Sequence, residues 1–154
     1  RRRHTRFRNV TGVQTCALPI YVVAFNDKDV KLSDRLYASS SDLRGFQQRG
    51  VGPVDSGDHV GGNNLATLSL KSTFPNPIPE NLRPTTFLFL DMGNVWGVDY
   101  SNTISDSSKI RSSTGVGLDL MSPIGPLSFT YSIPLSKAST DKEQNFLFNI
   151  GSSF

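Results

Sequence analysis

The sequence of 154 residues has a single cysteine, Cys16, and two histidines. One cysteine excludes an intramolecular disulfide and any zinc site built from several thiolates, although it does not identify the cellular compartment. Long apolar runs are also missing, because no stretch approaches the ~20 residues that a membrane-spanning helix needs. Good helix formers are scarce and no helical periodicity is present, so a helical protein is excluded.

The sequence has few residues that could carry catalysis or bind a metal. His59 lies in "DSGDHVGG" beside Asp55 and Asp58, but no ligand spacing typical of a zinc or calcium site surrounds it. No serine, histidine and aspartate form an arrangement that stands out from the many serines of the chain. We therefore predict a protein that is not an enzyme and that has no catalytic residue, metal or cofactor.

Acidic residues are absent from residues 1–20, "RRRHTRFRNVTGVQTCALPI", which contain five arginines and the only cysteine. A basic arm for nucleic acid is one interpretation of these residues. A signal peptide is another, but it needs an apolar run of roughly 7–15 residues, which Thr11, Gly12, Gln14 and Thr15 interrupt. "VTGVQTCALPI" resembles the in-frame translation of a short-read sequencing adapter. We interpret residues 1–20 as a non-native segment and exclude them.

This exclusion changes the charge. The 16 basic residues minus five arginines leave 11, against 13 acidic residues, so the net charge changes from +3 to −2. The basic balance that would favour a nucleic-acid partner disappears, and we predict no such partner. We take residues 21–154 as one domain.

Alternation of apolar and polar residues is the strongest pattern in the rest of the chain. Such a period of two indicates strands with one apolar and one polar face. In "PLSFTYSIPL" the apolar face carries Leu127, Phe129, Tyr131, Ile133 and Leu135. The predicted strands are residues 62–74, 85–98, 110–122, 125–136 and 143–154, and "YVVAF" at 21–25 is the end of one more.

Two all-β architectures share this alternation, a soluble sandwich and a transmembrane barrel. Strands in soluble proteins average about 5–6 residues, whereas tilted membrane-spanning strands need about 9–11, and the predicted strands are mostly long. Their polar faces are rich in glycine, serine, asparagine and threonine, which suits a water-filled lumen. Bacterial single-chain barrels start at eight strands, so the sequence predicts the C-terminal part of a larger antiparallel barrel.

Six motifs in a fixed order resemble the C-terminal barrel of the BamA family of outer-membrane protein assembly factors. They are "LRGF" at 43–46, "GVGP" at 50–53, "GGN" at 61–63, "DMGNVWG" at 91–97, "MSPIGPL" at 121–127 and "FNIGSSF" at 148–154. The resemblance covers residues 21–154. It implies the last five to six strands of a sixteen-stranded barrel, with residues 27–61 as a long loop that folds into the lumen.

The resemblance also implies a function. Members of the family insert and fold β-barrel proteins into the bacterial outer membrane, with unfolded clients, outer-membrane lipid, accessory lipoproteins and periplasmic chaperones as partners. A relative in the same superfamily, such as a TamA-like protein or a two-partner secretion transporter, is one alternative. A passive porin-like channel is another.

For the loop, the resemblance implies that Arg44 binds lumen carboxylates, with Asp91 on a neighbouring strand as the partner. The planar guanidinium suits this role because it binds a carboxylate through two parallel hydrogen bonds. Gly45 and Phe46 complete the motif. Lys71 stands where the family often has a second acid, so we expect it to repel Arg44 and to compete for Asp91.

The C-terminal residues Phe146, Phe148 and Phe154 resemble the β-signal of outer-membrane proteins, and Ile150 lies on the same face. In the family, a weak seam between the first and last strands is where client strands pair. Residues 143–154 would form one side of this seam. Gly151 lacks packing area, which suits a strand that bends or separates.

Overall fold

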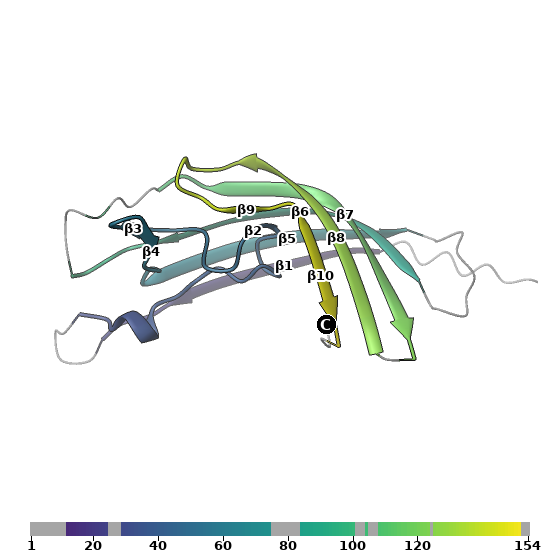
Figure 1. The fold of residues 1–154 in the computed structure, drawn as a ribbon, viewed down its shortest axis with the longest axis horizontal. Coiled ribbons are helices and arrows are strands. Elements are labelled where there is room, and N and C mark those ends of the chain that lie inside the picture. Colours follow the sequence, from purple (N-terminus) through teal and green to yellow (C-terminus); the bar gives the residue numbers. More distant parts are fainter. Residues whose placement is uncertain are drawn as a thin grey trace, which may run out of the picture.

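The structure, a computed structural model, describes residues 12–24, 29–74, 84–100, 104, 108–123 and 125–151. Six strands form one antiparallel, curved sheet in the order β1-β5-β6-β7-β8-β10 (Figure 1). Each long strand therefore lies beside the next long strand along the chain. The strands are β1 (Gly12–Tyr21), β5 (Asn64–Phe74), β6 (Thr85–Trp96), β7 (Arg111–Ser122), β8 (Gly125–Ser136) and β10 (Phe146–Ile150).

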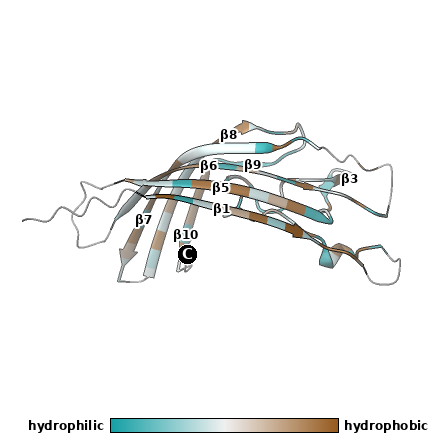
Figure 2. Ribbon diagram, turned by 180° about the vertical axis from the view of Figure 1, so that it is seen from behind, coloured by the Kyte–Doolittle hydropathy of each residue, from teal (hydrophilic) through white to brown (hydrophobic). Residues whose placement is uncertain are grey.

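The predicted strands agree with the structure within a few residues at each end, and the all-β fold class is confirmed. The exception is the range 143–154, which forms two elements. Residues Glu143–Gln144 make the short strand β9, and the chain then continues into β10. Figure 2 shows bands of hydrophilic and hydrophobic colour along β5.

The edge strand β1 lies almost entirely within residues 1–20. It pairs with β5 from Gly12 to Tyr21, and all of its residues are exposed. Of the predicted strand end "YVVAF", Tyr21 belongs to the strand, residues 22–24 follow it, and Phe25 lies outside the described residues. Main-chain pairing accepts any extended segment beside an open strand edge, so this pairing is compatible with a non-native sequence at this position. The interpretation of residues 1–20 as an adapter stays a prediction.

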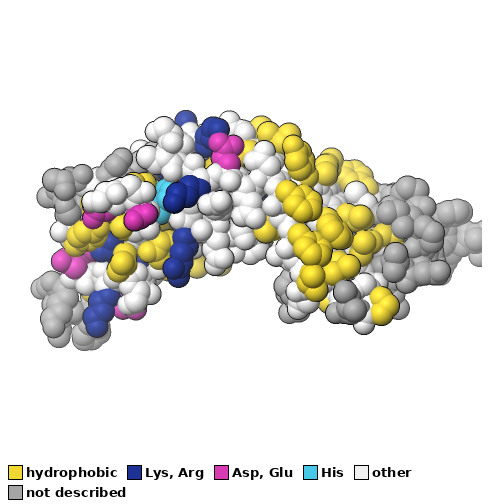
Figure 3. Space-filling model, viewed as in Figure 1, with side chains coloured by type: hydrophobic (Ala, Val, Ile, Leu, Met, Phe, Trp, Pro, Cys, Tyr) yellow, Lys and Arg dark blue, Asp and Glu magenta, His cyan; other side chains and the backbone are white. Residues whose placement is uncertain are grey.

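The sheet is polar on its covered face and apolar on its open face, the reverse of a soluble sandwich. Ser113 and Ser132 are 0% exposed, whereas Val116 and Tyr131 on the opposite face are 49% and 52% exposed. Figure 3 shows hydrophobic side chains gathered where β7, β8 and β10 lie in Figure 1. An apolar outer face and a polar inner face are what a transmembrane barrel presents to lipid and lumen.

The inner face is covered by the long loop, described here from residue 29 to 63. It contains a 3-10 turn η1 (Leu32–Asp34) and the short strands β2 (Gly45–Phe46), β3 (Val54–Asp55) and β4 (Asp58–His59). No helix in the described part of the chain is long and apolar enough to cross a membrane. A small apolar core joins the loop to β5 and β6, and it consists of Ala38, Leu43, Phe46, Val51, Leu65 and Val95.

Candidate functional site

The centre of the inner face is an ion pair between the loop and β6. Arg44 donates through Nε to Asp91 Oδ2 at 2.7 Å and through one terminal nitrogen to Oδ1 at 2.8 Å. The main-chain N–H of Arg44 also donates to Oδ2 at 3.1 Å. Asp91 is 0% exposed and the Arg44 side chain only 11%. A buried carboxylate needs such charged and hydrogen-bonding partners, so the pair fixes the loop to this point of the wall.

The other partners of Arg44 are polar groups and an aromatic ring, which replace a second acid. Ser69 on β5 accepts from the guanidinium at 2.8 Å and donates to Asp91 at 2.7 Å. The guanidinium lies over the ring of Phe89, 3.8 Å from its centroid. The hydroxyl of Ser113 on β7 donates to the carbonyl oxygen of Arg44. Arg44 is therefore held by three adjacent strands.

Gly45 and Phe46 follow Arg44 and set how closely the loop approaches the wall. Gly45 has a φ of 93°, a left-handed conformation that side chains disfavour. A Cβ there would lie 3.1 Å from that of Ser113 and 3.4 Å from that of Ser132. Phe46 is 2% exposed and packs in the apolar core under the loop. Glycine thus permits the close contact, and phenylalanine anchors it.

Lys71 does not compete for Asp91, contrary to our expectation. Its ammonium nitrogen lies 3.0 Å from Asp119 Oδ2 on β7 and 3.7 Å from the centroid of the Phe87 ring. Asp119 also accepts a hydrogen bond from Ser128 at 2.7 Å. The lysine side chain is long enough to cross β6 over the Phe87 ring, and Asp119 shares the inner face by alternation. The charge of Lys71 is therefore neutralised by Asp119, away from Arg44.

Asp42, in the loop two residues before Arg44, is an acid with a shifted pKa. Burial, and secondly the negative charge of Asp91, raise the pKa of Asp42 above its ordinary value. Asp91 therefore attracts the positive charge of Arg44 and at the same time disfavours the ionised form of Asp42.

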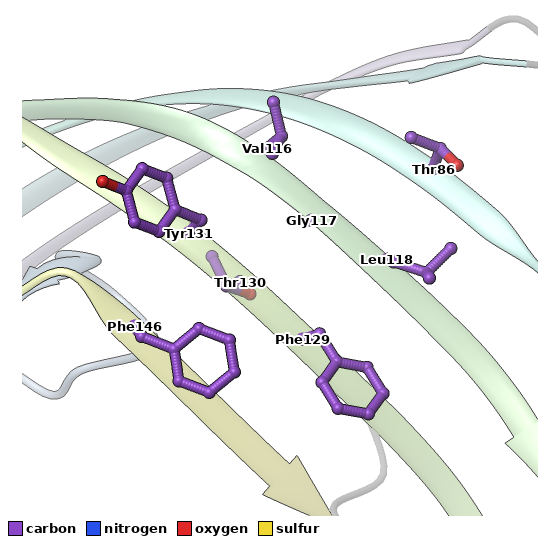
Figure 4. Close-up of a pocket in the computed structure, with 8 residues that line it drawn as sticks. All are labelled: Thr86, Val116, Gly117, Leu118, Phe129, Thr130, Tyr131 and Phe146. Carbon is purple, nitrogen blue, oxygen red and sulfur yellow. The ribbon is translucent and has the colours of Figure 1, made fainter.

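The last strand lies at the edge of the sheet. Phe146, Phe148 and Ile150 are on the outer face, and Phe148 stacks on Phe129 of β8 with a centroid distance of 4.8 Å. Phe146 and Phe129 line a shallow groove of ≈ 290 Å³ on this face, and Figure 4 shows how the labelled side chains around it lie. Gly151 has a φ of 72° and ends the strand, donating to the carbonyl of Pro126 at 2.9 Å. Phe154 lies outside the described residues.

Sequence reasoning missed a second buried ion pair. Arg111 at the start of β7 donates to both carboxylate oxygens of Asp141, each at 3.0 Å, and both side chains are 0% exposed. Alternation along β7 places Arg111 on the inner face. Asp141 lies in the polar connection between β8 and β9, where no sequence periodicity predicts which way a side chain points. A third pair, between Arg35 and Asp99 at 3.5 Å, joins the loop to the chain after β6.

Among the described residues, no group of three or more histidine, cysteine or acidic side chains could hold a metal ion. His59 instead contacts main-chain carbonyl oxygens, that of Gly52 at 3.3 Å and that of Thr140 at 3.1 Å. The site is therefore built from ion pairs and main-chain contacts that fix a loop, and its strand edge offers main-chain pairing.

Comparison with known proteins places this arrangement in a family. The model of the Omp85 superfamily domain matches residues 5–154. The outer membrane protein assembly factor BamA of Neisseria meningitidis serogroup B is 28% identical over 155 residues, covering 82% of this chain and 19% of that protein. The sorting assembly machinery 50 kDa subunit of Saccharomyces cerevisiae is 33% identical, covering 74% of this chain and 25% of that protein.

The solved structures give the same result. The crystal structure of BamA from Haemophilus ducreyi lacking POTRA domains 1–3 matches with a TM-score of 0.78 and 31% identity, over 88% of this chain and 30% of that one. The chain thus spans about a fifth of the length of its bacterial relative from Neisseria. The expected outer-membrane location agrees with the relatives named BamA. The chain belongs to the Omp85 superfamily, and its sheet and loop have the fold of the C-terminal strands of a BamA barrel.

Proposed function

We propose that residues 21–154 form the last strands of a larger outer-membrane barrel that inserts and folds other β-barrel proteins. The observation that carries the proposal is the edge strand β10, which pairs with β8 from Phe146 to Ile150 in the part of the chain that the structure describes. It is the terminal strand in the sheet order. A short strand at a sheet edge is held by few hydrogen bonds and offers main-chain groups to an incoming strand.

The chemistry required for this function is pairing rather than bond breaking. A client strand would add to the edge through main-chain N–H and C=O groups, which makes recognition largely independent of client sequence. Its apolar side chains would lie on the outer face, next to Phe146 and Phe148, and so enter lipid directly. We propose that no covalent catalysis and no cofactor take part.

The loop would act as the internal support of this edge. Because Arg44 binds Asp91 and contacts three strands, the loop braces the inner wall from β5 to β7. The relatives named BamA and the sorting assembly machinery subunit favour an assembly role over a passive channel.

The partners follow from this role. Unfolded outer-membrane proteins would be the clients, and outer-membrane lipid would contact the outer face. By family resemblance, accessory lipoproteins and periplasmic chaperones would deliver clients and support the complex. The relatives named BamA and the sorting assembly machinery subunit support a role in barrel assembly.

The test replaces Arg44 in the complete barrel that contains these strands, reconstituted in liposomes. Arg44→Ala should leave Asp91 buried and uncompensated, and it should slow the folding of an added client barrel at least about tenfold. Asp119→Asn is the matched control, because it removes a half-buried acid of the same wall that Arg44 does not touch. Client folding is read as resistance of the client to protease.

The same preparations distinguish the channel alternative. An insertase should fold the added clients, whereas a passive channel should conduct ions steadily in planar bilayers without folding them. Steady ion conductance with no effect of the liposomes on client folding would exclude the proposed function.

A further inference from the structure

The connection between β8 and β10 folds back over the inner face, where Asp141 is buried. Besides its two bonds from Arg111, Asp141 accepts the main-chain N–H of Ala138 at 2.5 Å. Arg111 also donates to Asn94 on β6 and to the carbonyl oxygen of Lys109 at 3.0 Å. The turn that leads into the last strand is thus fixed to β6 and β7 through one buried ion pair.

The residues just after Asp141 pair with the long loop. Strand β2 is antiparallel to β9, with Gly45 opposite Gln144 and Phe46 opposite Glu143. The ladder continues through Gln47, whose N–H donates to the carbonyl of Lys142 at 2.9 Å, and through Lys142, whose N–H donates to the carbonyl of Gly50 at 2.9 Å. The chain entering the last strand is therefore a strand partner of the segment that contains Gly45 and Phe46.

Pairing between β8 and the last strand stops where this second pairing begins. The final rung is the N–H of Ser132 donating to the carbonyl of Asn145 at 2.7 Å. In an antiparallel ladder, alternate residues direct their main-chain groups to the same side, so Pro134 is the next β8 residue facing this edge. Proline has no N–H to donate. The last strand therefore cannot extend along β8 by a normal rung beyond Ser132, and residues 142–144 pair with the loop instead.

We propose that Arg111 and Asp141 are positioning residues for the last strand, and that residues 141–145 couple the docking of the loop to the strength of the seam. The same short segment starts β10 and completes the sheet contact of β2. Seating of Arg44 on Asp91 holds β2 in place, β2 holds residues 142–144, and these hold the upstream end of β10. Release at either ion pair frees the segment, and Pro134 prevents it from being captured by β8 instead.

The consequence for the last strand is specific. With residues 141–145 released, β10 keeps only its pairing with β8 between Leu127 and Tyr131 and loses its upstream anchor. Its opening becomes more frequent, which exposes the edge of β8 as well. The consequence for client assembly rests on the proposed function, but the coupling itself does not.

Hydrogen exchange in the complete barrel, purified in detergent micelles without client, tests the coupling. Asp141→Asn keeps the size of the side chain and removes its charge. We expect amides of Leu147, Asn149 and Gln47 to exchange about tenfold faster or more, since a buried cation has lost its partner. Amides of the β5–β6 ladder should not change. Lys137→Gln is the matched control, because it removes the exposed ion pair to Glu143 in the same connection.

A second variant perturbs the loop instead of Asp141, and it tests the coupling if Asp141→Asn does not fold. Arg44→Gln breaks the loop contact on β6, far along the chain from β10. Faster exchange in both the loop and β10 supports the coupling. Faster exchange confined to the mutated element, in either variant, overturns it. Loss of client folding with unchanged exchange in β10 would leave the function intact and refute the coupling.

Discussion

The ring of Phe87 on β6 lies against Gly117, its cross-strand partner on β7. A Cβ built on Gly117 would collide with three atoms of that ring. The neighbouring pair repeats the relationship, since Phe89 is opposite Gly115 and a Cβ there would lie 2.7 Å from Phe89 Cζ. Large rings on one strand thus cover glycines on the next. The two rings thereby form an aromatic surface, which the Lys71 ammonium and the Arg44 guanidinium contact.

We predict that Gly117→Ala destabilises the barrel by about 1–3 kcal/mol, because the added methyl group forces the Phe87 ring from its position. Unfolding of the complete barrel in urea with lipid vesicles measures the change. Phe87→Ala in the same background provides the control. In the double variant, Gly117→Ala should cost much less, since no ring remains to be displaced. An equal cost with and without the ring would contradict this packing.

The ion pair of Lys71 and Asp119 should show as an energetic coupling. Lys71→Met and Asp119→Asn should each destabilise the barrel, and the double variant should be more stable than the sum of the two predicts. Because both side chains are partly buried, we expect a coupling free energy of about 0.5–3 kcal/mol. A double-mutant cycle on unfolding measures it. A coupling near zero, or one found between Lys71 and Asp91 instead, would contradict the observed pairing.

The raised pKa of Asp42 predicts an opposite pH dependence from that of an ordinary ion-paired acid. Burial first, and then Asp91, favour its protonated form in the folded state. The unfolded chain therefore ionises first as pH rises, and stability contributed by Asp42 is lost from about pH 3.9 up to its folded pKa. Asp42→Asn should raise stability at pH 7 and change little below about pH 3. An identical pH profile of the unfolding free energy in both proteins would refute this.

An arginine placed on the outer face should destabilise the barrel more, the deeper its position lies in the membrane. Val116 lies in the middle of β7, and Ile110 lies just before its start, and both are exposed. If this face meets lipid, Val116→Arg should cost about 2–4 kcal/mol and Ile110→Arg about 0–1 kcal/mol. Folding into lipid vesicles gives both values. Equal tolerance of arginine at the two positions would indicate that water, not lipid, covers the face.

Much of the fold can be predicted from the sequence, because alternation acts on neighbouring residues. The face of each side chain on β5 to β8 follows from its strand and its parity, and the inward placement of Asp91 follows in the same way. Arg44 as its partner follows from the motif around it. The partner of Lys71 does not, since Asp91 and Asp119 share the inner face and parity cannot choose between them. The register of β6 and β7 places the Phe87 ring beside the Lys71 ammonium, and it brings Asp119 rather than Asp91 within reach of that ammonium.

The sequence by itself determined the long strands, their apolar and polar faces and the glycine and arginine of the loop motif, because these depend on local periodicity and side-chain chemistry. Only the tertiary structure decided which charges meet. Arg111 and Asp141 lie 30 residues apart, and β2 meets β9 across nearly a hundred residues of chain. Such contacts depend on how the sheet curves and where the loop enters it, and no local pattern in the sequence contains that geometry.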